Sequence, residues 1–590
     1  MASFIEINES HKFTFINKLT NEFYKFIGEV YIEYKNKKQT EIIKDVVKDV
    51  VEDVSKDVSM ELEVEEIGNT LGESNLNETK SKPINQTFID YLLFKLYYNY
   101  GVKRRMVNDH IALLYYSKNL KGYKSNEPIT MLCRHMLLDT RILRIISLGI
   151  PKSVKLEDFC NSYNIDKDNF KTNYVNGELD DSSDLSISKS RIYKFSEGTM
   201  LVYNPSLKKY SVTTISTKDD EDNLDTDDKM DIDNSTQELI DNNIEVKFNQ
   251  QFMYSTRKVV GTGCFSSIKT FSEMFEENNN IANTNLENIP EEIINNTVLV
   301  FNIEHPENRV ISTQLRNFNT LCAVFQIKNE DIVLEQYNKI MEIEYSLDKD
   351  DIIKSAFVEL GNDMVTQIQV ANFKKQVQEY NVNLHLPEII KSFEKLESDG
   401  VTKTTININE LSINQIDAIV QNKPKDFQGY IIYGLNGERS KFTNLKYKEL
   451  RSLKGSKPIV IEQWNTKNLF NLYWRLVKEQ KIEQFIKEFD INTGIGELGD
   501  KQYMYTKLFN WFLSLVRIYA LNLFKIYHNA FVKKTFPKSQ IPFSMKPMCG
   551  DLHTEYLKNK VPISPTMVEQ YIFNQQVNKI FWRIFLDNKQ

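Results

Sequence analysis

Residues 298–309 read Val-Leu-Val-Phe-Asn-Ile-Glu-His-Pro-Glu-Asn-Arg, an apolar run that stops at a proline and an asparagine. Valine, phenylalanine and isoleucine favour extended backbone, whereas Pro306 and Asn308 are of the types that turns prefer. The stretch therefore predicts a β-strand that ends in a tight corner.

Short apolar runs of the same kind recur on both sides of this strand. They cover residues 136–138, 142–148, 199–203, 210–215, 252–255, 322–327, 404–408 and 430–433. Many short strands separated by Gly, Asn or Pro are typical of antiparallel sheets. We expect helices between them over 335–342 and 351–373, and an asparagine-rich loop over 276–296.

Helical periodicity replaces these runs towards the carboxyl end, over residues 470–487, 503–533 and 565–576. We therefore predict an α+β chain in which an antiparallel-sheet domain over 83–460 is followed by a helical domain over 461–590. Residues 1–40 are expected to pack on the sheet domain.

Two charged segments interrupt this pattern. Residues 41–82 contain the near-repeat Lys-Asp-Val-Val at 44–47 and 48–51, and residues 218–243 are rich in aspartate. A four-residue period makes the apolar stripe of a helix drift around its surface, and the second segment has few apolar residues to bury. We expect a partly helical, mostly disordered insert over 41–82 and a disordered loop over 218–243, both available to protein partners.

The overall charge bounds the function. The chain of 590 residues has a formal net charge of −7, which argues against a protein that coats nucleic acid non-specifically but is compatible with a local basic channel. Its five cysteines have neither zinc-type spacing nor a disulfide framework, which favours a reducing, cytoplasmic compartment. The apolar run 509–524 is interrupted by Arg517 and Asn522, so we expect no membrane span.

Residues 194–199, Lys-Phe-Ser-Glu-Gly-Thr, carry the most informative motif. They resemble the Lys-x-Asp-Gly nucleotide-attachment motif of the bacteriophage-type RNA ligases and their relatives in large DNA viruses. If Glu197-Gly198 corresponds to Asp-Gly, Phe195 stands at the nucleophile's position and Lys194 lies one residue before it. Because side chains on a strand alternate between faces, Lys194 would reach the opposite face unless a β-bulge intervenes.

The resemblance extends, in the family's order, over residues 88–460, and it implies an antiparallel-sheet nucleotidyltransferase core. It also implies roles for individual side chains: phosphate contacts for the basic residues, stacking on the base for Phe301, and a ribose or metal contact for Glu304. The nucleotide-binding residues it implies are Arg134, Lys152, Glu197, Gly198, Arg257, Phe301, Glu304, Arg309 and Lys441. Taken singly, each match also fits an ordinary turn, strand end or surface arginine.

Four positions depart from the family's chemistry. Phe195 replaces the lysine that attacks the α-phosphorus of the nucleotide, Asn302 and Gln428 replace carboxylates, and Thr443 replaces a lysine that would offset phosphate charge. The resemblance together with these losses predicts a degenerate, catalytically inactive RNA-ligase-like protein of a large DNA virus. It would serve as an RNA-binding or structural module in the host cytoplasm, virus factory or virion.

An active enzyme is the alternative. An ATP-dependent RNA ligase would use ATP and Mg²⁺ as cofactors, with Lys194 brought to the site by a bulge and Glu304 holding the metal beside Glu197. A capping-type guanylyltransferase would need the same lysine. If neither chemistry remains, no cofactor is expected.

Overall fold

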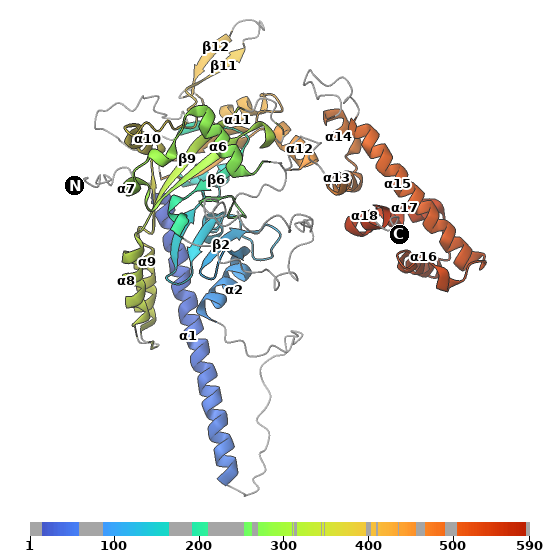
Figure 1. Cartoon of the computed structure of the whole chain (residues 1–590), viewed down its shortest axis with the longest axis horizontal. Helices are drawn as coiled ribbons and strands as arrows, with labels where there is room; N and C mark the ends of the chain where they lie inside the picture. Colours follow the sequence, from blue (N-terminus) through green and yellow to red (C-terminus); the bar gives the residue numbers. More distant parts are fainter. Residues whose placement is uncertain are drawn as a thin grey trace, which may run out of the picture.

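Figure 1 shows the computed structural model of the chain, a mixed α+β molecule with antiparallel sheets and a helical carboxy-terminal region. The predicted α+β class, with its helical carboxy-terminal part, is confirmed at this level. The structure describes residues 14–57, 87–163, 191–209, 253–261, 269–308, 311, 316–343, 345–346, 349–396, 403–408, 411–434, 436–455, 466–489 and 504–585.

The first sheet is a four-stranded antiparallel meander in the order β1-β2-β3-β4. Its strands are β1 (Val102–Met106), β2 (Ile111–Tyr116), β3 (Met136–Asp139) and β4 (Arg144–Leu148). The short helix α3 (Pro128–Leu132) precedes β3, and α4 (Leu156–Ser162) follows β4. Alternate strand residues, such as Ala112 and Leu114, point into a core shared with helices α1 (Thr14–Asp57) and α2 (Phe88–Tyr100).

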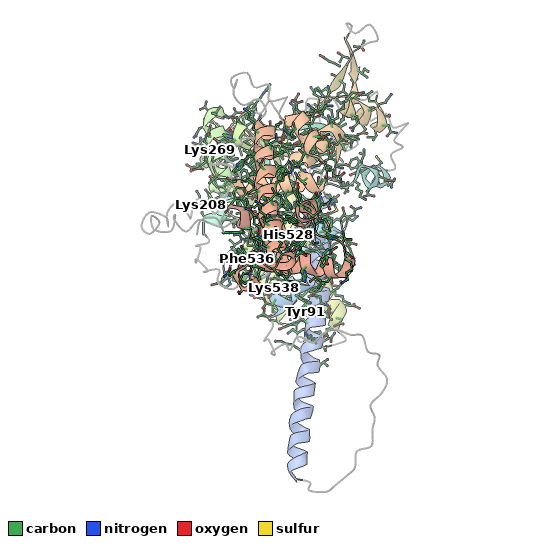
Figure 2. All side chains as sticks on the ribbon, turned by 90° about the vertical axis from the view of Figure 1, so that its right-hand side faces the viewer. Tyr91, Lys208, Lys269, His528, Phe536 and Lys538 are labelled. Carbon is green, nitrogen blue, oxygen red and sulfur yellow. The ribbon has the colours of Figure 1, made fainter. Side chains whose placement is uncertain are left out.

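Helix α1 runs along the sheet domain and continues past it, as the perpendicular views of Figures 1 and 2 show. Ile16, Phe23 and Ile27 of α1 are fully buried in the shared core. Tyr91 of α2, labelled in Figure 2, fastens the two helices, because its hydroxyl donates to the Glu33 carboxylate of α1 at 2.7 Å.

Residues 41–57 belong to α1, which agrees with the partly helical character expected of residues 41–82. Once tertiary packing has formed the first turns of a helix, each added residue costs little, so the weak apolar stripe of the Lys-Asp-Val repeat suffices for continuation. The remainder, 58–82, lies outside the described residues. The same holds for the acidic segment 218–243 and for the strand expected over 210–215.

The second sheet has five antiparallel strands in the order β10-β9-β8-β6-β7. They are β6 (Thr199–Tyr203), β7 (Tyr254–Ser255), β8 (Thr297–Glu304), β9 (Phe318–Ile327) and β10 (Val365–Ile368). On one face Val298 and Val300 of β8 join the core below the first sheet. On the other face Leu299 and Ile303 pack against α6 (Phe271–Ala282) and α10 (Val370–Gln378).

Two loop and helix expectations near this sheet are wrong. Residues 276–296 are not a loop but contain most of α6 and the short α7 (Glu291–Ile294). Thr270 and Glu273 form a capping box at the start of α6, a signal that the sequence shows. The helix expected over 351–373 is divided into α9 (Asp350–Gly361) and α10 by strand β10, which pairs with β9 and so gains ladder hydrogen bonds.

A third sheet has the order β14-β13-β5, with β5 (Arg191–Phe195), β13 (Gly429–Tyr433) and β14 (Arg439–Thr443). Its outer face packs on α4 and α11 (Ile413–Gln421). The hairpin β11 (Ser392–Leu396) and β12 (Lys403–Asn407) projects from the molecule (Figure 1). After β14 the chain enters α12 (Leu445–Lys454).

The carboxy-terminal region is all helical in its described part, and Figure 2 views it face on, with His528 labelled. Its helices are α13 (Thr466–Lys478), α14 (Ile482–Phe489), α15 (Met504–Tyr527), a π-helical segment (His528–Val532), α16 (Lys546–Asn559), α17 (Pro565–Phe573) and α18 (Val577–Phe585). Aromatic rings dominate their core, among them Phe470, Trp474 and Phe512. Tyr447 of α12 is buried in the same core, so α12 joins the sheet domain to these helices. 

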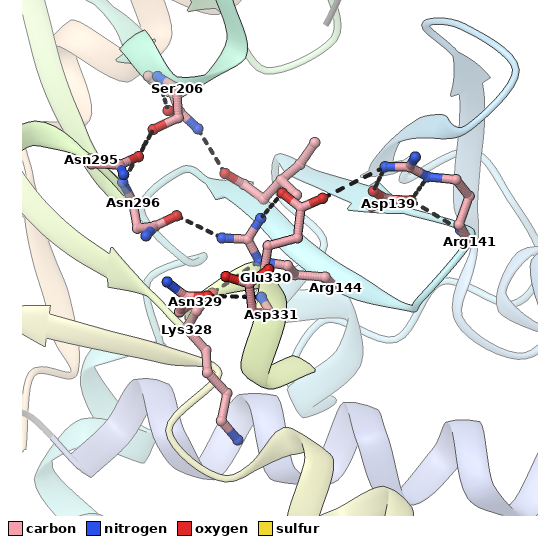
Figure 3. Close-up of polar contacts among 12 residues, drawn as sticks. Asp139, Arg141, Arg144, Ser206, Asn295, Asn296, Lys328, Asn329, Glu330 and Asp331 are labelled. Carbon is pink, nitrogen blue, oxygen red and sulfur yellow. Dashed lines mark hydrogen bonds and ion pairs between the residues drawn. The ribbon is translucent and has the colours of Figure 1, made fainter. Parts of the chain in front are cut away.

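A buried polar cluster holds the first and second sheets together (Figure 3). The guanidinium group of Arg144 in β4 donates to the Lys328 carbonyl at 2.9 Å, to Asn296 Oδ1 at 2.7 Å and to the Glu330 carboxylate at 3.3 Å. Asn296 precedes β8, and Glu330 opens α8 (Glu330–Met341). The network fixes the edge of the second sheet against β4.

Candidate functional site

A cavity of about 840 Å³ is lined by residues of the second and third sheets and of α12. Its size falls in the range of small-molecule sites. Four groups of residues line it. The third sheet contributes Tyr193, Lys194, Phe195, Ile431, Tyr433, Arg439, Lys441 and Thr443, and the second sheet contributes Met200, Phe301, Asn302, Glu304, Phe318, Thr320 and Cys322. Helix α12 contributes Leu445, Tyr447, Lys448 and Arg451. The connecting segments contribute Lys118, Arg134, Ile150, Ser196, Gly198, Arg257, Arg316, residues 385–388 and Gln428.

Strand register explains which side chains of the third sheet face the cavity. Phe195 pairs with Gly429 across β5 and β13, and Ile431 pairs with Lys441 across β13 and β14. Residues of the opposite parity, such as Ile192 and Ile432, lie in the core on the outer face. Alternation therefore directs Phe195 and Lys441 towards the cavity.

The second sheet forms the facing wall. Asn302 and Glu304 of β8 have the same parity and both line the cavity. A Cβ atom at Gly198 would lie 2.7 Å from the amide atoms of Asn302, so only glycine allows β6 to approach β8 this closely.

A short extended segment closes one side between the two sheets. The Leu321 amide donates to the His385 carbonyl at 2.8 Å, and the Lys194 amide donates to the Glu388 carbonyl at 3.1 Å. The segment 385–388 thus bridges β9 and β5 through backbone hydrogen bonds.

The lining is strongly cationic. Nine of its side chains are lysine or arginine and two are glutamate, Glu304 and Glu388. Among the residues that the structure describes, none of the nine basic groups has a carboxylate within ion-pair distance. Arg439 is buried and four others are half-buried, namely Arg134, Arg257, Lys441 and Arg451. Charges removed from water are normally paired, so this excess predicts an anionic ligand.

Lys441 illustrates the excess best. Burial, and then the charges of Arg439 and Arg134, hold the pKa of its ammonium group well below the ordinary value. The group lies 4.2 Å from the centre of the Phe195 ring, a favourable cation–π distance. A cation–π contact stabilises an ammonium group less than an ion pair does, so an anion that enters the cavity could bind Lys441.

Arginines surround Lys441 and leave donors unused. Arg439 is 7% exposed and donates from one terminal nitrogen to the Pro151 carbonyl at 2.9 Å, while its Nε has no partner. Arg257 lies 4.2 Å over the Tyr116 ring and also has an unpaired Nε. Burial and the charge of Arg439 lower the pKa of Arg134 to about 9. Gln428 adds an unpaired buried Oε1 atom.

Glu304 is an acidic residue of the otherwise cationic lining. Burial raises the pKa of its carboxyl group, and a hydrogen bond from Ser196 and the charges of Lys194 and Arg316 partly offset this rise. The group is half-buried in β8. No group of three or more His, Cys, Asp or Glu side chains in the described part of the chain could hold a metal ion.

Lys194 lies on the wrong face of its strand for a nucleophile. It pairs with Tyr430, whose ring is in the outer core, and the pairing of β5 with β13 runs without a register shift. The bulge required by the active-enzyme alternative is therefore not present in β5. Lys194 is exposed and still contributes to the lining, near enough to Glu304 to influence its pKa.

Glu197 has a structural environment. Its buried carboxylate accepts hydrogen bonds from the Tyr447 hydroxyl at 2.6 Å and from the Ile311 amide at 2.9 and 3.0 Å. Burial and the negative charge of Glu197 raise the pKa of Tyr447. The carboxylate thus ties the start of β6 to α12 and is not among the residues that line the cavity.

The remaining sequence candidates are placed as follows. Arg134, Gly198, Arg257, Glu304 and Lys441 all line the cavity. Phe301 is also among the lining residues, but it is 2% exposed and its ring packs on Phe275 at 4.9 Å on the far face of the second sheet. Lys152 donates to the Ser125 carbonyl at 2.6 Å and does not line the cavity. Arg309 lies outside the described residues.

Several cations of the cavity escaped the sequence comparison. They are Lys118, Arg316, Arg439, Lys448 and Arg451. Arg439 lies two residues before Lys441 on the same strand, so strand alternation could have identified it. The others come from loops and from α12, and no local pattern distinguishes them from surface residues.

No protein-family model matches the chain, and a search of curated proteins finds no match either. The candidate site therefore depends on its own geometry.

Proposed function

We propose that this chain is a divergent relative of the phage-type RNA ligases that binds a nucleotide or RNA phosphate without forming a covalent intermediate. The observation that carries the proposal is the contact between Phe195 and Lys441. An aromatic ring occupies the cavity face of β5, where the attachment motif requires an amine, and the Lys441 ammonium group lies 4.2 Å from it. A phenyl ring cannot form the phosphorus–nitrogen bond of a lysyl nucleotide.

The arrangement of the sheets supports the ligase-like core. The attachment motif lies at the junction of β5 and β6, and these strands belong to the two sheets that line the cavity. Arg134, Arg257 and Lys441, which the resemblance assigns to phosphate contacts, come from separate segments and meet in one cavity. A triphosphate or an RNA phosphate group fits these unpaired cations.

Magnesium fits the lining less well. The carboxylates of Glu304 and Glu388 are the acidic groups available there, and Asn302 and Gln428 provide neutral amides. Mg²⁺ prefers carboxylate and phosphate oxygens in octahedral geometry. We therefore derive no catalytic step through a metal ion, and the proposal assigns no resident metal to the protein.

The test uses the full chain with α-labelled ATP or GTP and Mg²⁺ or Mn²⁺, followed by a denaturing gel. We expect no labelled band. A band that disappears in the Lys194→Ala variant would establish the active-ligase alternative.

A binding assay completes the test. Labelled ATP and a 5′-phosphorylated trinucleotide should bind at low salt, with affinity that falls as salt rises. Lys441→Met should weaken both, and Lys425→Met is the matched control, because Lys425 is a surface residue paired with Glu488 at 2.6 Å. Absence of binding to both ligands would leave a purely structural role.

A further inference from the structure

Three aromatic side chains are exposed together on α2. Phe94, Tyr97 and Tyr98 are 48%, 42% and 62% exposed. The rings of Phe94 and Tyr98 lie 4.6 Å apart, and those of Tyr97 and Tyr98 lie 5.8 Å apart. The opposite face of the helix, with Leu92 and Leu96, supplies its packing. The three rings therefore contribute little to the packing of α2 on the core.

Acidic and basic side chains both lie near α2, and two of the acidic ones are paired: Glu33 of α1 contacts Lys95 of α2 at 2.5 Å. Asp90, the acidic residue of α2, lies one turn before Phe94 and is paired with Arg104 of β1 at 3.2 Å. The connection from β2 to α3 adds the exposed Lys121 and Lys124. Exposed lysines near a cluster of exposed rings suit a ligand that combines flat apolar faces with negative charge.

The same connection joins the aromatic rings to the cavity. Its Lys118 lines the cavity, and Gly122 lies so close to α2 that a Cβ atom there would overlap the Tyr98 carbonyl oxygen. The Ser117 amide donates to the Gly101 carbonyl at 2.8 Å, which holds the connection against the end of α2.

Further rings and cations mark the path between the two places. Arg257, which lines the cavity, stacks on Tyr116, and the Tyr116 ring lies 5.4 Å from that of Tyr123. Tyr123 follows Gly122 and contacts Gly101 at the end of α2. One cation, the buried ring of Tyr116 and the ring of Tyr123 thus connect the cavity to the end of α2.

We propose that Phe94, Tyr97 and Tyr98 form a stacking platform for the bases of single-stranded RNA whose terminal phosphate lies in the cavity. The inference rests on the proposed function, because the cavity must first take a phosphate. Aromatic faces accept any base, and lysines neutralise the backbone between them, which is how single-stranded nucleic acid is bound without sequence preference. Charge complementarity and continuity with the cavity favour RNA over a protein partner.

The experiment measures fluorescence anisotropy of the full chain with two 5′-phosphorylated RNAs, a trinucleotide and an oligonucleotide of about 16 nucleotides. The longer RNA should bind more tightly. The triple variant Phe94→Ser, Tyr97→Ser, Tyr98→Ser should lose about 10-fold or more of affinity for the longer RNA and none for the trinucleotide. All three positions are exposed, so the thermal midpoint should not change.

Two controls separate stacking from other causes. An abasic oligonucleotide of the same length keeps the phosphates, and it should bind the wild type and the triple variant equally. The paired variant Trp511→Ser, Ile518→Ser removes exposed apolar side chains from α15, and it should leave RNA affinity unchanged.

The outcomes distinguish the two proposals. Unchanged affinity of the triple variant for the longer RNA would overturn the platform and leave the rings as a protein-docking surface or as merely exposed. If the trinucleotide does not bind but the longer RNA binds through the three rings, the proposed function of the cavity fails and the platform remains. If both RNAs bind equally, the platform fails and the cavity function remains.

Discussion

Arg144 and Arg439 are both buried arginines, 3% and 7% exposed, but they differ in their partners. Arg144 donates to a carbonyl, an amide and a carboxylate, so its charge is compensated within the fold (Figure 3). Arg439 has one backbone acceptor, an unpaired Nε and further cations nearby. We infer that the compensated charge of Arg144 stabilises the packing of the two sheets, whereas the uncompensated charge of Arg439 indicates a binding site for an external anion.

The largest expected effect is the loss of stability when Arg144, the compensated arginine, is removed. Arg144→Ala removes one donor from Glu330, which also lies 3.9 Å from Arg141, and removes the guanidinium donor of the Lys328 carbonyl and of Asn296 Oδ1. We expect the free energy of unfolding to fall by about 3–5 kcal/mol, because three acceptors lose a hydrogen bond. Urea denaturation measures this loss. Lys339→Ala is the control, because Lys339 pairs with Glu335 on the surface of α8 at 2.7 Å with both side chains 68% exposed, and it should cost about 1 kcal/mol or less. Equal losses in both variants would contradict the assignment of Arg144 as the main link.

Lys441→Met should act in the opposite direction on stability. Removing a half-buried ammonium group that lies among other cations should raise the urea midpoint of the free protein. The loss of one charge-assisted contact should weaken ATP binding by about 2 kcal/mol, roughly 30-fold. Calorimetry and denaturation on the same preparation give both values. A variant that loses stability and keeps its affinity would show that Lys441 belongs to the fold.

The hydrogen bond between Tyr447 and Glu197 is a third buried polar contact, and like that of Arg144 it is compensated within the fold. Tyr447→Phe removes the hydroxyl that donates to the Glu197 carboxylate and keeps the ring in the core, so we expect a loss of about 1.5–3 kcal/mol. Hydrogen exchange in α12 should increase, while ATP affinity should stay within about twofold, roughly 0.4 kcal/mol, of the wild type. Glu197→Gln should reproduce the pattern. A large loss of affinity in both variants would give Glu197 a role in the cavity.

The smallest effect is the pH dependence of binding. Burial and neighbouring cations depress the pKa of Lys441, and a bound anion would raise it again, so binding takes up protons between the two values. Affinity should be constant below the depressed pKa and should fall as pH rises through it, by at most about tenfold per pH unit. The stability of the free protein changes in the opposite direction: it rises as pH passes from the depressed pKa to the ordinary value, because the charged form is disfavoured in the folded state. Lys441→Arg should flatten both profiles, since arginine stays charged.

Much of the sheet architecture could be predicted locally. The runs at 199–203, 298–303 and 430–433 coincide closely with β6, β8 and β13, because β-branched and aromatic residues bounded by turn residues leave few alternatives. Strand β10 was missed inside a helical pattern, since only its pairing with β9 makes the extended form favourable. The helix α6 was missed because asparagine content outweighed its capping box in the sequence interpretation.

The candidate site divides in the same way. Strand parity in the sequence already placed Lys194 and Phe195 on opposite faces, and the regular pairing of β5 keeps them there. Phe301 could not be judged from its motif, because both faces of β8 are covered and only the tertiary structure shows its ring packed on Phe275. The same applies to Glu197, whose donors come from residues 311 and 447.

By itself, the sequence determined the strands, the helical carboxy-terminal region and the absence of lysine at position 195, since these depend on residue type and on periods of two and 3.6 residues. Only the tertiary structure decided that Arg134, Arg439 and Lys441 share one cavity without a carboxylate partner among the described residues. The physical reason is that charge compensation is a property of distance in space, and these three residues are brought together by sheets whose strands are remote in the chain.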